Sequence, residues 1–147
     1  AEVMGHPGTD AVVFDQVVEF ARAIGMVPVP LHKEHPGYVL NSLLIPFLSA
    51  AGSLFVRGVT DFESIDKTWM IATGGRMGPF GIMDIIGMQT IYDIELLLGK
   101  KLNDKAMLAR AAFFKRNFID RGKLGVKSGE GFYKYPNPVY RATGFLK

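Results

Sequence analysis

An uncharged stretch from Pro36 to Val56 constrains the fold of this chain more than any other feature. It is long enough to cross a bilayer, yet it contains Asn41, Pro46 and several serines. A helix packed among other helices accommodates that mixture more readily than a helix in lipid. We therefore expect a core helix from about Tyr38 to Arg57, kinked or started at Pro46 and buried on every side, within a larger protein or an obligate dimer.

Helix signals account for most of the remaining chain. Capping residues and following glycines predict helices from Thr9 or Asp10 to Ile24, from Thr60 (the first residue of a capping box) to Thr73, from a tight turn at Met77–Phe80 through Ile86, from Gln89 to Leu98 with Gly99 as its end, and from Asn103 or Asp104 to Asp120. Strand-like segments are confined to Ala1–Met4 and to Met26–Leu31, whose two prolines are typical of an edge strand. The sequence thus predicts a mainly α fold.

Composition and charge exclude several classes of protein. The chain has 147 residues and no cysteine, which rules out a disulfide scaffold, a thiol nucleophile and a cysteine-ligated metal. A formal net charge of +3 is spread thinly along the chain, so we expect no nucleic-acid partner. The N-terminal residues lack a basic segment followed by an apolar run, and we expect a cytoplasmic protein with no membrane contact.

The common cofactor and metal motifs are absent from the sequence. No Gly-x-Gly-x-x-Gly follows a strand, and Gly74–Gly78 lacks the Lys-Ser/Thr ending of a phosphate-binding loop, so it is interpreted as a helix-ending turn. His32 and His35 have the separation of metal ligands but lie in a proline-flanked link. We interpret them as a surface pair and expect no metal site.

Two polar residues stand out because of their apolar neighbours. Glu2 lies in the first strand-like segment, where its side chain faces either solvent or a buried cationic partner. Asn41 lies near the start of the uncharged helix, where a buried amide must find hydrogen-bond partners. On physical grounds alone, a structural role is the simpler interpretation of both residues.

Three motifs in order carry a resemblance to a known family. They are His35-Pro-Gly-Tyr-Val-Leu-Asn41, Met77-Gly-Pro-Phe-Gly-Ile-Met-Asp84 and Lys127-Ser-Gly-Glu-Gly-Phe-Tyr133. Together they resemble the C-terminal domain of 3-hydroxyacyl-CoA dehydrogenases, nearest to the 3-hydroxybutyryl-CoA type. The second and third motifs are interpreted as packing turns.

The resemblance implies a fold and a set of partners. Residues 1–147 would form the helical dimerisation domain, of the 6-phosphogluconate-dehydrogenase C-terminal type, with a remnant strand at its start. A Rossmann domain that holds most of the NAD or NADP would lie outside the chain. The intact enzyme would be a homodimer that interconverts 3-hydroxyacyl-CoA and 3-oxoacyl-CoA, and this fragment alone would be inactive.

The resemblance also assigns two site residues. Glu2 corresponds to the carboxylate that orients a catalytic histidine located before residue 1, and Asn41 to an amide that binds the substrate. An imidazole base with a carboxylate on its other nitrogen suits oxidation of a hydroxyl. Two alternatives stay open: a helical dimerisation or acyl-binding module without redox chemistry, and a related β-hydroxyacid or sugar-acid dehydrogenase.

Overall fold

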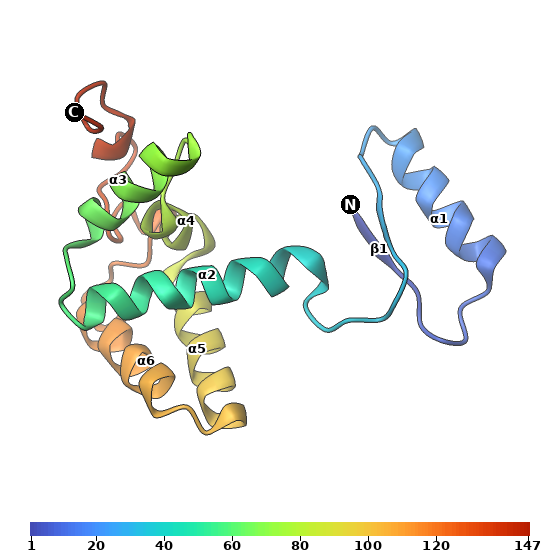
Figure 1. Ribbon diagram of the computed structural model, residues 1–147, viewed down its shortest axis with the longest axis horizontal. Coiled ribbons are helices and arrows are strands. Elements are labelled where there is room, and N and C mark those ends of the chain that lie inside the picture. The colour runs from blue at the N-terminus through green and yellow to red at the C-terminus, as the bar shows by residue number, and fades with distance from the viewer. The chain divides into compact units, whose positions relative to one another are not determined.

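The computed structural model describes all 147 residues and is mainly helical, with six α-helices, three short 3-10 helices and one two-stranded sheet (Figure 1). The expected mainly α fold class is confirmed. The chain divides into two compact units, Ala1–Pro46 and Phe47–Lys147. The boundary between these units falls within the long apolar helix, and the expected single helical domain of residues 1–147 stays a prediction.

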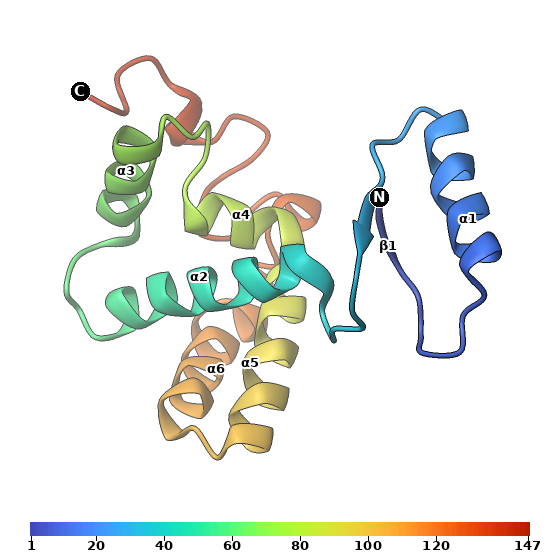
Figure 2. The same cartoon turned by 45° about the vertical axis from the view of Figure 1, so that its right-hand side comes forward.

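The first unit is built on a parallel strand–helix–strand motif. Its elements are β1 (Glu2–Met4), α1 (Ala11–Ala23) and β2 (Val29–Leu31). The strands pair in parallel, with Glu2 opposite Val29. Asp10 caps α1 as predicted, because its carboxylate accepts hydrogen bonds from the Val12 and Val13 amides. The expected remnant strand is therefore one strand of a complete parallel βαβ unit, in which β1 and α1 lie side by side (Figures 1 and 2).

The second unit is a helical body closed by a glycine-rich tail. Its helices are α3 (Phe62–Thr73), α4 (Pro79–Ile86), α5 (Met88–Leu102) and α6 (Lys105–Asn117), and its 3-10 turns are η1 (Ile119–Arg121), η2 (Val126–Ser128) and η3 (Val139–Arg141). Helices α5 and α6 run side by side in both views (Figure 2). Aromatic rings from several elements form the core. Phe80 of α4 and Phe132 of the tail, for example, have ring centroids 4.6 Å apart.

The predicted start of α3 and the predicted ends of α5 and α6 differ from the structure. The N-cap of α3 is Asp61 and not Thr60, since the Asp61 carboxylate accepts the Ser64 amide at 2.8 Å. Gly99 does not end α5; it lies within the helix, where a Cβ would come within 2.9 Å of Leu108. Its missing side chain therefore serves close packing of α5 on α6. Helix α6 ends at Asn117, and a 3-10 turn replaces its predicted last residues.

Helix α2 (Tyr38–Val56) ends within one residue of the prediction, and the chain alone does not bury it. Only Leu48, Ala51 and Gly52 are buried, and Leu43 keeps 68% of its surface exposed. The expectation places full burial of α2 within a larger protein or a dimer, and the chain by itself leaves most of the helix exposed. By length and composition α2 also passes as a membrane-crossing helix, a test that apolar helices of soluble proteins pass as well.

Candidate functional site

Glu2 lies against the first turn of α2. The Val39 and Leu40 amides donate to its Oε1 at 2.8 and 3.2 Å, and the Leu40 amide makes a longer contact of 3.4 Å with Oε2. The side chain is half-buried, and so it does not simply face solvent. One carboxylate oxygen is thus committed to the helix, while the other keeps lone pairs for a further donor.

The first turn of α2 requires such an acceptor because it has no capping side chain of its own. Gly37 and Tyr38, which open the helix, both have positive φ angles, 87° and 56°. The first amides of any helix lack partners within the helix, and its N-terminus favours a negative charge. Glu2 satisfies both requirements from a strand far earlier in the chain.

Asn41 occupies the same first turn and is exposed. The structural alternative, a buried amide bonded to backbone, therefore does not describe this residue. Its neighbour Leu40 donates its amide to Glu2, so the two site residues named from the resemblance lie at the start of one helix. The structure brings Glu2 and Asn41 to one place, and their chemical roles stay predictions.

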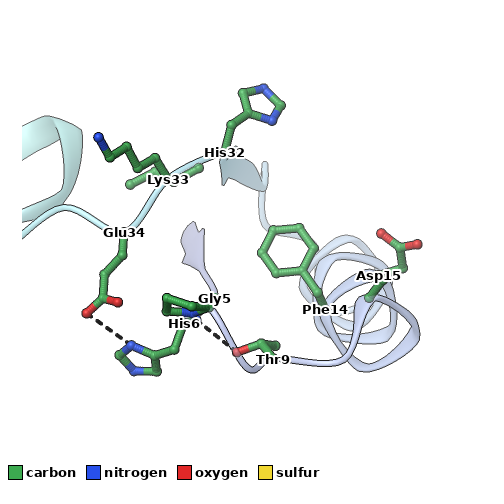
Figure 3. A pocket seen from close by; sticks show the side chains of 11 residues that line it. Gly5, His6, Thr9, Phe14, Asp15, His32, Lys33 and Glu34 are labelled. Atoms are coloured by element: carbon green, nitrogen blue, oxygen red, sulfur yellow. Dashed lines mark hydrogen bonds and ion pairs between the residues drawn. The ribbon is translucent and has the colours of Figure 1, made fainter.

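A second polar cluster lies where the two strands end. A pocket of about 520 Å³ is found there, and His6 Nδ1 lies 3.1 Å from Glu34 Oε1 on one side of it (Figure 3). The side chains of His32 and Lys33 point away from this pair. Neither Glu2 nor Asn41 lines the pocket. Sequence reasoning missed the His6–Glu34 pair because the two residues follow different strands and share no spacing signal.

The N-terminus of α1 does not fit the phosphates of a dinucleotide. In a dinucleotide-binding βαβ unit, free amides at this position face the pyrophosphate. Here the Asp10 carboxylate already accepts the Val12 amide at 2.7 Å and the Val13 amide at 3.3 Å. A carboxylate at this position would repel a phosphate, so these residues do not provide the cofactor cradle. The chain also contains no group of three histidine, aspartate or glutamate side chains that could hold a metal ion.

Asp66 is a fully buried carboxylate that caps α4 from α3. Its Oδ1 accepts the Phe80 amide at 2.8 Å, and its Oδ2 accepts the Gly81 amide and the Tyr133 hydroxyl, each at 3.0 Å. Burial raises the pKa of Asp66 to about 6, although these three hydrogen bonds act in the opposite direction. Gly78 allows this arrangement, because a Cβ at that position would lie 2.4 Å from Asp66.

Asp84 fastens the glycine-rich tail to α4 in a similar way. It accepts the Phe132 and Tyr133 amides at 2.8 and 2.9 Å and the Tyr135 hydroxyl at 3.0 Å. Burial raises the pKa of Asp84 as well. A Cβ at Gly131 would come within 2.0 Å of the Asp84 carboxylate. These contacts explain the second and third sequence motifs as packing turns that hold the tail.

Comparisons with known proteins agree on one family. Residues 37–135 match the model for the C-terminal domain of 3-hydroxyacyl-CoA dehydrogenase. The mitochondrial hydroxyacyl-coenzyme A dehydrogenase of Mus musculus is 36% identical over 91% of the chain and 42% of its own length. The 3-hydroxybutyryl-CoA dehydrogenase of Clostridioides difficile is 33% identical over 91% of the chain and 47% of its own length.

A solved structure is more similar in sequence. A diketoreductase, described as carrying out substrate-directed dual catalysis of dicarbonyl compounds, is 55% identical with a TM-score of 0.85. The match covers 92% of this chain and 46% of that one. The chain therefore spans less than half the length of each of these relatives.

Proposed function

The chain belongs to the 3-hydroxyacyl-CoA dehydrogenase family, and from this membership we propose that it completes the substrate site of an enzyme interconverting 3-hydroxyacyl-CoA and 3-oxoacyl-CoA. The family match over residues 37–135 carries the proposal. We further propose a short substrate, 3-hydroxybutyryl-CoA, which the Clostridioides difficile relative has in its name.

The family implies a nicotinamide cofactor, which accepts or returns the hydride of the substrate carbon. Because Asp10 occupies the N-terminus of α1, we propose that NAD or NADP is bound by the other half of the enzyme, which the relatives possess and this chain does not cover. The parallel βαβ motif of the first unit, from Glu2 to Leu31, lies outside residues 37–135 and would then pack with that half.

In this enzyme Glu2 would orient the base. An imidazole from the cofactor-binding half removes the hydroxyl proton as hydride leaves, and a carboxylate on its other nitrogen fixes the tautomer and stabilises the imidazolium. The less occupied oxygen of Glu2, Oε2, is the available acceptor. Asn41, exposed on the neighbouring turn, would donate a hydrogen bond to the substrate oxygen on which negative charge develops during reduction.

The test requires the enzyme joined to its cofactor-binding half. We expect NADH or NADPH consumption with acetoacetyl-CoA, and none with residues 1–147 alone. Asn41→Ala should lower kcat/KM by a factor that corresponds to roughly 2 to 4 kcal/mol. Asn137→Ala, at an exposed asparagine of the tail, is the matched control and should leave kcat/KM unchanged. Unchanged kinetics in Asn41→Ala would remove Asn41 from the site.

A second candidate function is the reduction of dicarbonyl compounds that carry no CoA. The observation in its favour is the 55% identity to the diketoreductase, against 33–36% for the two CoA-linked relatives. A 3-oxoacyl-CoA is itself a 1,3-dicarbonyl, so one site suits both chemistries. Acetoacetyl-CoA and ethyl acetoacetate present the same 3-oxobutanoyl group. A kcat/KM that favours the ethyl ester would assign the second function.

We also propose that the enzyme is a cytoplasmic homodimer. An apolar groove of about 360 Å³ runs between α2 and α3 in the second unit, and Leu54 and Trp69 line it with 41% and 39% of their surfaces exposed. Leu54→Lys should then dissociate the dimer in light scattering, whereas Leu97→Lys, on α5 outside the groove, should not. A native mass of one subunit would contradict the dimer, and cell fractionation tests the location.

A further inference from the structure

We propose that Glu2 has a second task in the reaction: through Oε1 it holds the first turn of α2, and thereby sets the position of Asn41. This inference rests on the proposed function, since it assigns Oε2 of the same carboxylate to the catalytic imidazole. Glu2 is then a positioning residue for two groups at once, the base on one side and the substrate-binding amide on the other.

Helix α2 lacks the local capping side chain that three other helices of the chain possess. Helices α1, α3 and α6 each begin directly after an aspartate whose carboxylate accepts their first amides. Helix α2 instead follows Gly37, which has no side chain, and starts at Tyr38 in a left-handed conformation. The nearby Ser42 hydroxyl donates to the Tyr38 carbonyl, and the Val39 and Leu40 amides donate to Glu2 and not to this hydroxyl. Glu2 is therefore the side chain that satisfies the Val39 and Leu40 amides.

Glu2 is suited to the task because it is fixed by a strand. Its backbone lies in the parallel ladder opposite Val29, and the following residue, Val3, is buried. The Val29 amide bonds the Ala1 carbonyl at 2.7 Å, which secures the strand directly before Glu2. A carboxylate on such a support transmits the position of β1 to the first turn of α2, including Asn41 beside Leu40.

The two oxygens allow the two tasks to be separated by substitution. In Glu2→Gln the amide oxygen still accepts the Val39 and Leu40 amides, but the NH₂ group that replaces Oε2 cannot accept a hydrogen bond from the imidazole N–H. In Glu2→Ala both tasks are lost. A capping contribution of about 1 kcal/mol corresponds to a change of roughly fivefold to tenfold in local opening of the turn.

Hydrogen exchange in the intact enzyme tests the anchoring without any turnover. We expect the peptide that contains the Val39 and Leu40 amides to exchange about fivefold to tenfold faster in Glu2→Ala and at the wild-type rate in Glu2→Gln. The Val12 and Val13 amides, capped by Asp10, are the internal reference and should not change. Equal exchange of the Val39–Leu40 peptide in wild type and Glu2→Ala would overturn the proposal.

Steady-state kinetics test the effect on Asn41. Glu2→Gln should lower kcat with little change in KM, and Glu2→Ala should in addition raise KM by about tenfold, because Asn41 is no longer held. In an Asn41→Ala background this difference between the Ala and Gln variants should vanish. A difference that persists there would overturn the positioning of Asn41. Wild type that turns over neither acetoacetyl-CoA nor ethyl acetoacetate would refute the proposed function instead, and the exchange result would still decide the anchoring.

Discussion

Glu2 in the first unit and Asp66 in the second do the same mechanical work in opposite surroundings. Each accepts the first amides of a helix that follows a glycine and lacks a local capping side chain, α2 for Glu2 and α4 for Asp66. Asp66 is completely buried, and both its oxygens accept hydrogen bonds of 3.0 Å or less, from two amides and a hydroxyl. Glu2 is half-buried and keeps one oxygen with only a long contact.

The difference shows that burial decides which role a helix-capping carboxylate can have, a structural role alone or a chemical role as well. Water does not reach Asp66, so it cannot replace a lost hydrogen-bond partner there. Each donor that Asp66 serves would stay buried and unpaired if the carboxylate were removed. Water can replace part of what Glu2 provides, and its remaining oxygen is accessible to a further group. Asp66 is therefore expected to matter for stability, and Glu2 for positioning and turnover.

The largest expected effect is that of Asp66→Ala. The change leaves the Phe80 and Gly81 amides and the Tyr133 hydroxyl buried without an acceptor, so we expect the free energy of unfolding to fall by about 4 kcal/mol in urea denaturation. Asp61→Ala is the matched control at the start of the same helix, α3, where the cap is exposed and the loss should be about 1 kcal/mol. Equal losses would contradict the expected difference between a buried capping carboxylate and an exposed one.

Gly131→Ala extends the test to Asp84, the other buried carboxylate that accepts backbone amides. A Cβ at this position would lie 2.0 Å from Asp84 Oδ1, so either the tail or α4 must move. We expect a loss of about 3 kcal/mol in thermal or urea unfolding. Gly8→Ala, in the loop between β1 and α1, has no atom within 4 Å of the new Cβ and should be neutral. A neutral Gly131→Ala would mean that the tail is loosely held.

The stability of the second unit should rise in mild acid. Burial raises the pKa of Asp66 from 3.8 to about 6, so the folded chain binds this proton more tightly than the unfolded chain. The free energy of unfolding should gain about 1 kcal/mol from this group between about pH 7 and about pH 5, and lose it again as pH rises through the folded pKa. The raised pKa of Asp84 acts in the same direction. Urea denaturation at a series of pH values measures the gain.

Asp66→Asn isolates that contribution, since the amide does not titrate. Exposed carboxylates act in the opposite direction: hydrogen bonds from Ser64 lower the pKa of Asp61, and a hydrogen bond from Lys123 lowers that of Glu130. Both lose their stabilising effect as pH falls through their folded pKa values. The informative quantity is therefore the difference between the wild-type and Asp66→Asn curves, and a difference that is independent of pH would contradict the prediction.

The smallest expected effect is that of Glu2→Ala on stability. Because Glu2 is half-exposed, water can bind the freed amides, and we expect the free energy of unfolding to fall by about 1 kcal/mol. Calorimetry or urea denaturation of the same chain used for Asp66→Ala measures it. A loss as large as that of Asp66→Ala would show that water does not reach Glu2. Its second oxygen would then not be accessible to an imidazole.

Sequence reasoning succeeded where a contact is local. Thr9 or Asp10 and Asn103 or Asp104 could be named as candidate caps because the amides they serve lie within three residues, and the structure selects Asp10 and Asp104. The choice of Thr60 over Asp61 failed because both residue types cap helices and Glu63 completes the capping-box pattern for Thr60. Gly99 failed for a related reason: a glycine ends helices and also admits a close neighbour, and only the position of Leu108 in the fold decides which.

Contacts between distant residues were beyond the reach of patterns. Glu2 and Val39 are 37 residues apart, and Asp66 and Phe80 are 14 apart, so no spacing marks either pair. Glu2 and Asn41 stand out by their apolar neighbours, but their site roles come only from a family resemblance, and the structure adds that Glu2 contacts the helix turn on which Asn41 lies. The apolar sequence of α2 predicts that the helix needs burial, but it does not reveal how much apolar surface the rest of the chain offers it.

The left-handed Tyr38 at the start of α2 bears on how such enzymes could exchange halves in evolution. The family's helical domain begins at residue 37, yet the acceptor for its first amides belongs to a strand outside that boundary. A recombination event that transfers the helical half alone would leave the first amides of α2 without their acceptor, and the first turn of the helix would open more readily. Only a recipient strand with an acidic residue at the position of Glu2 would restore the capping. We therefore expect this requirement to limit which recombined proteins are stable.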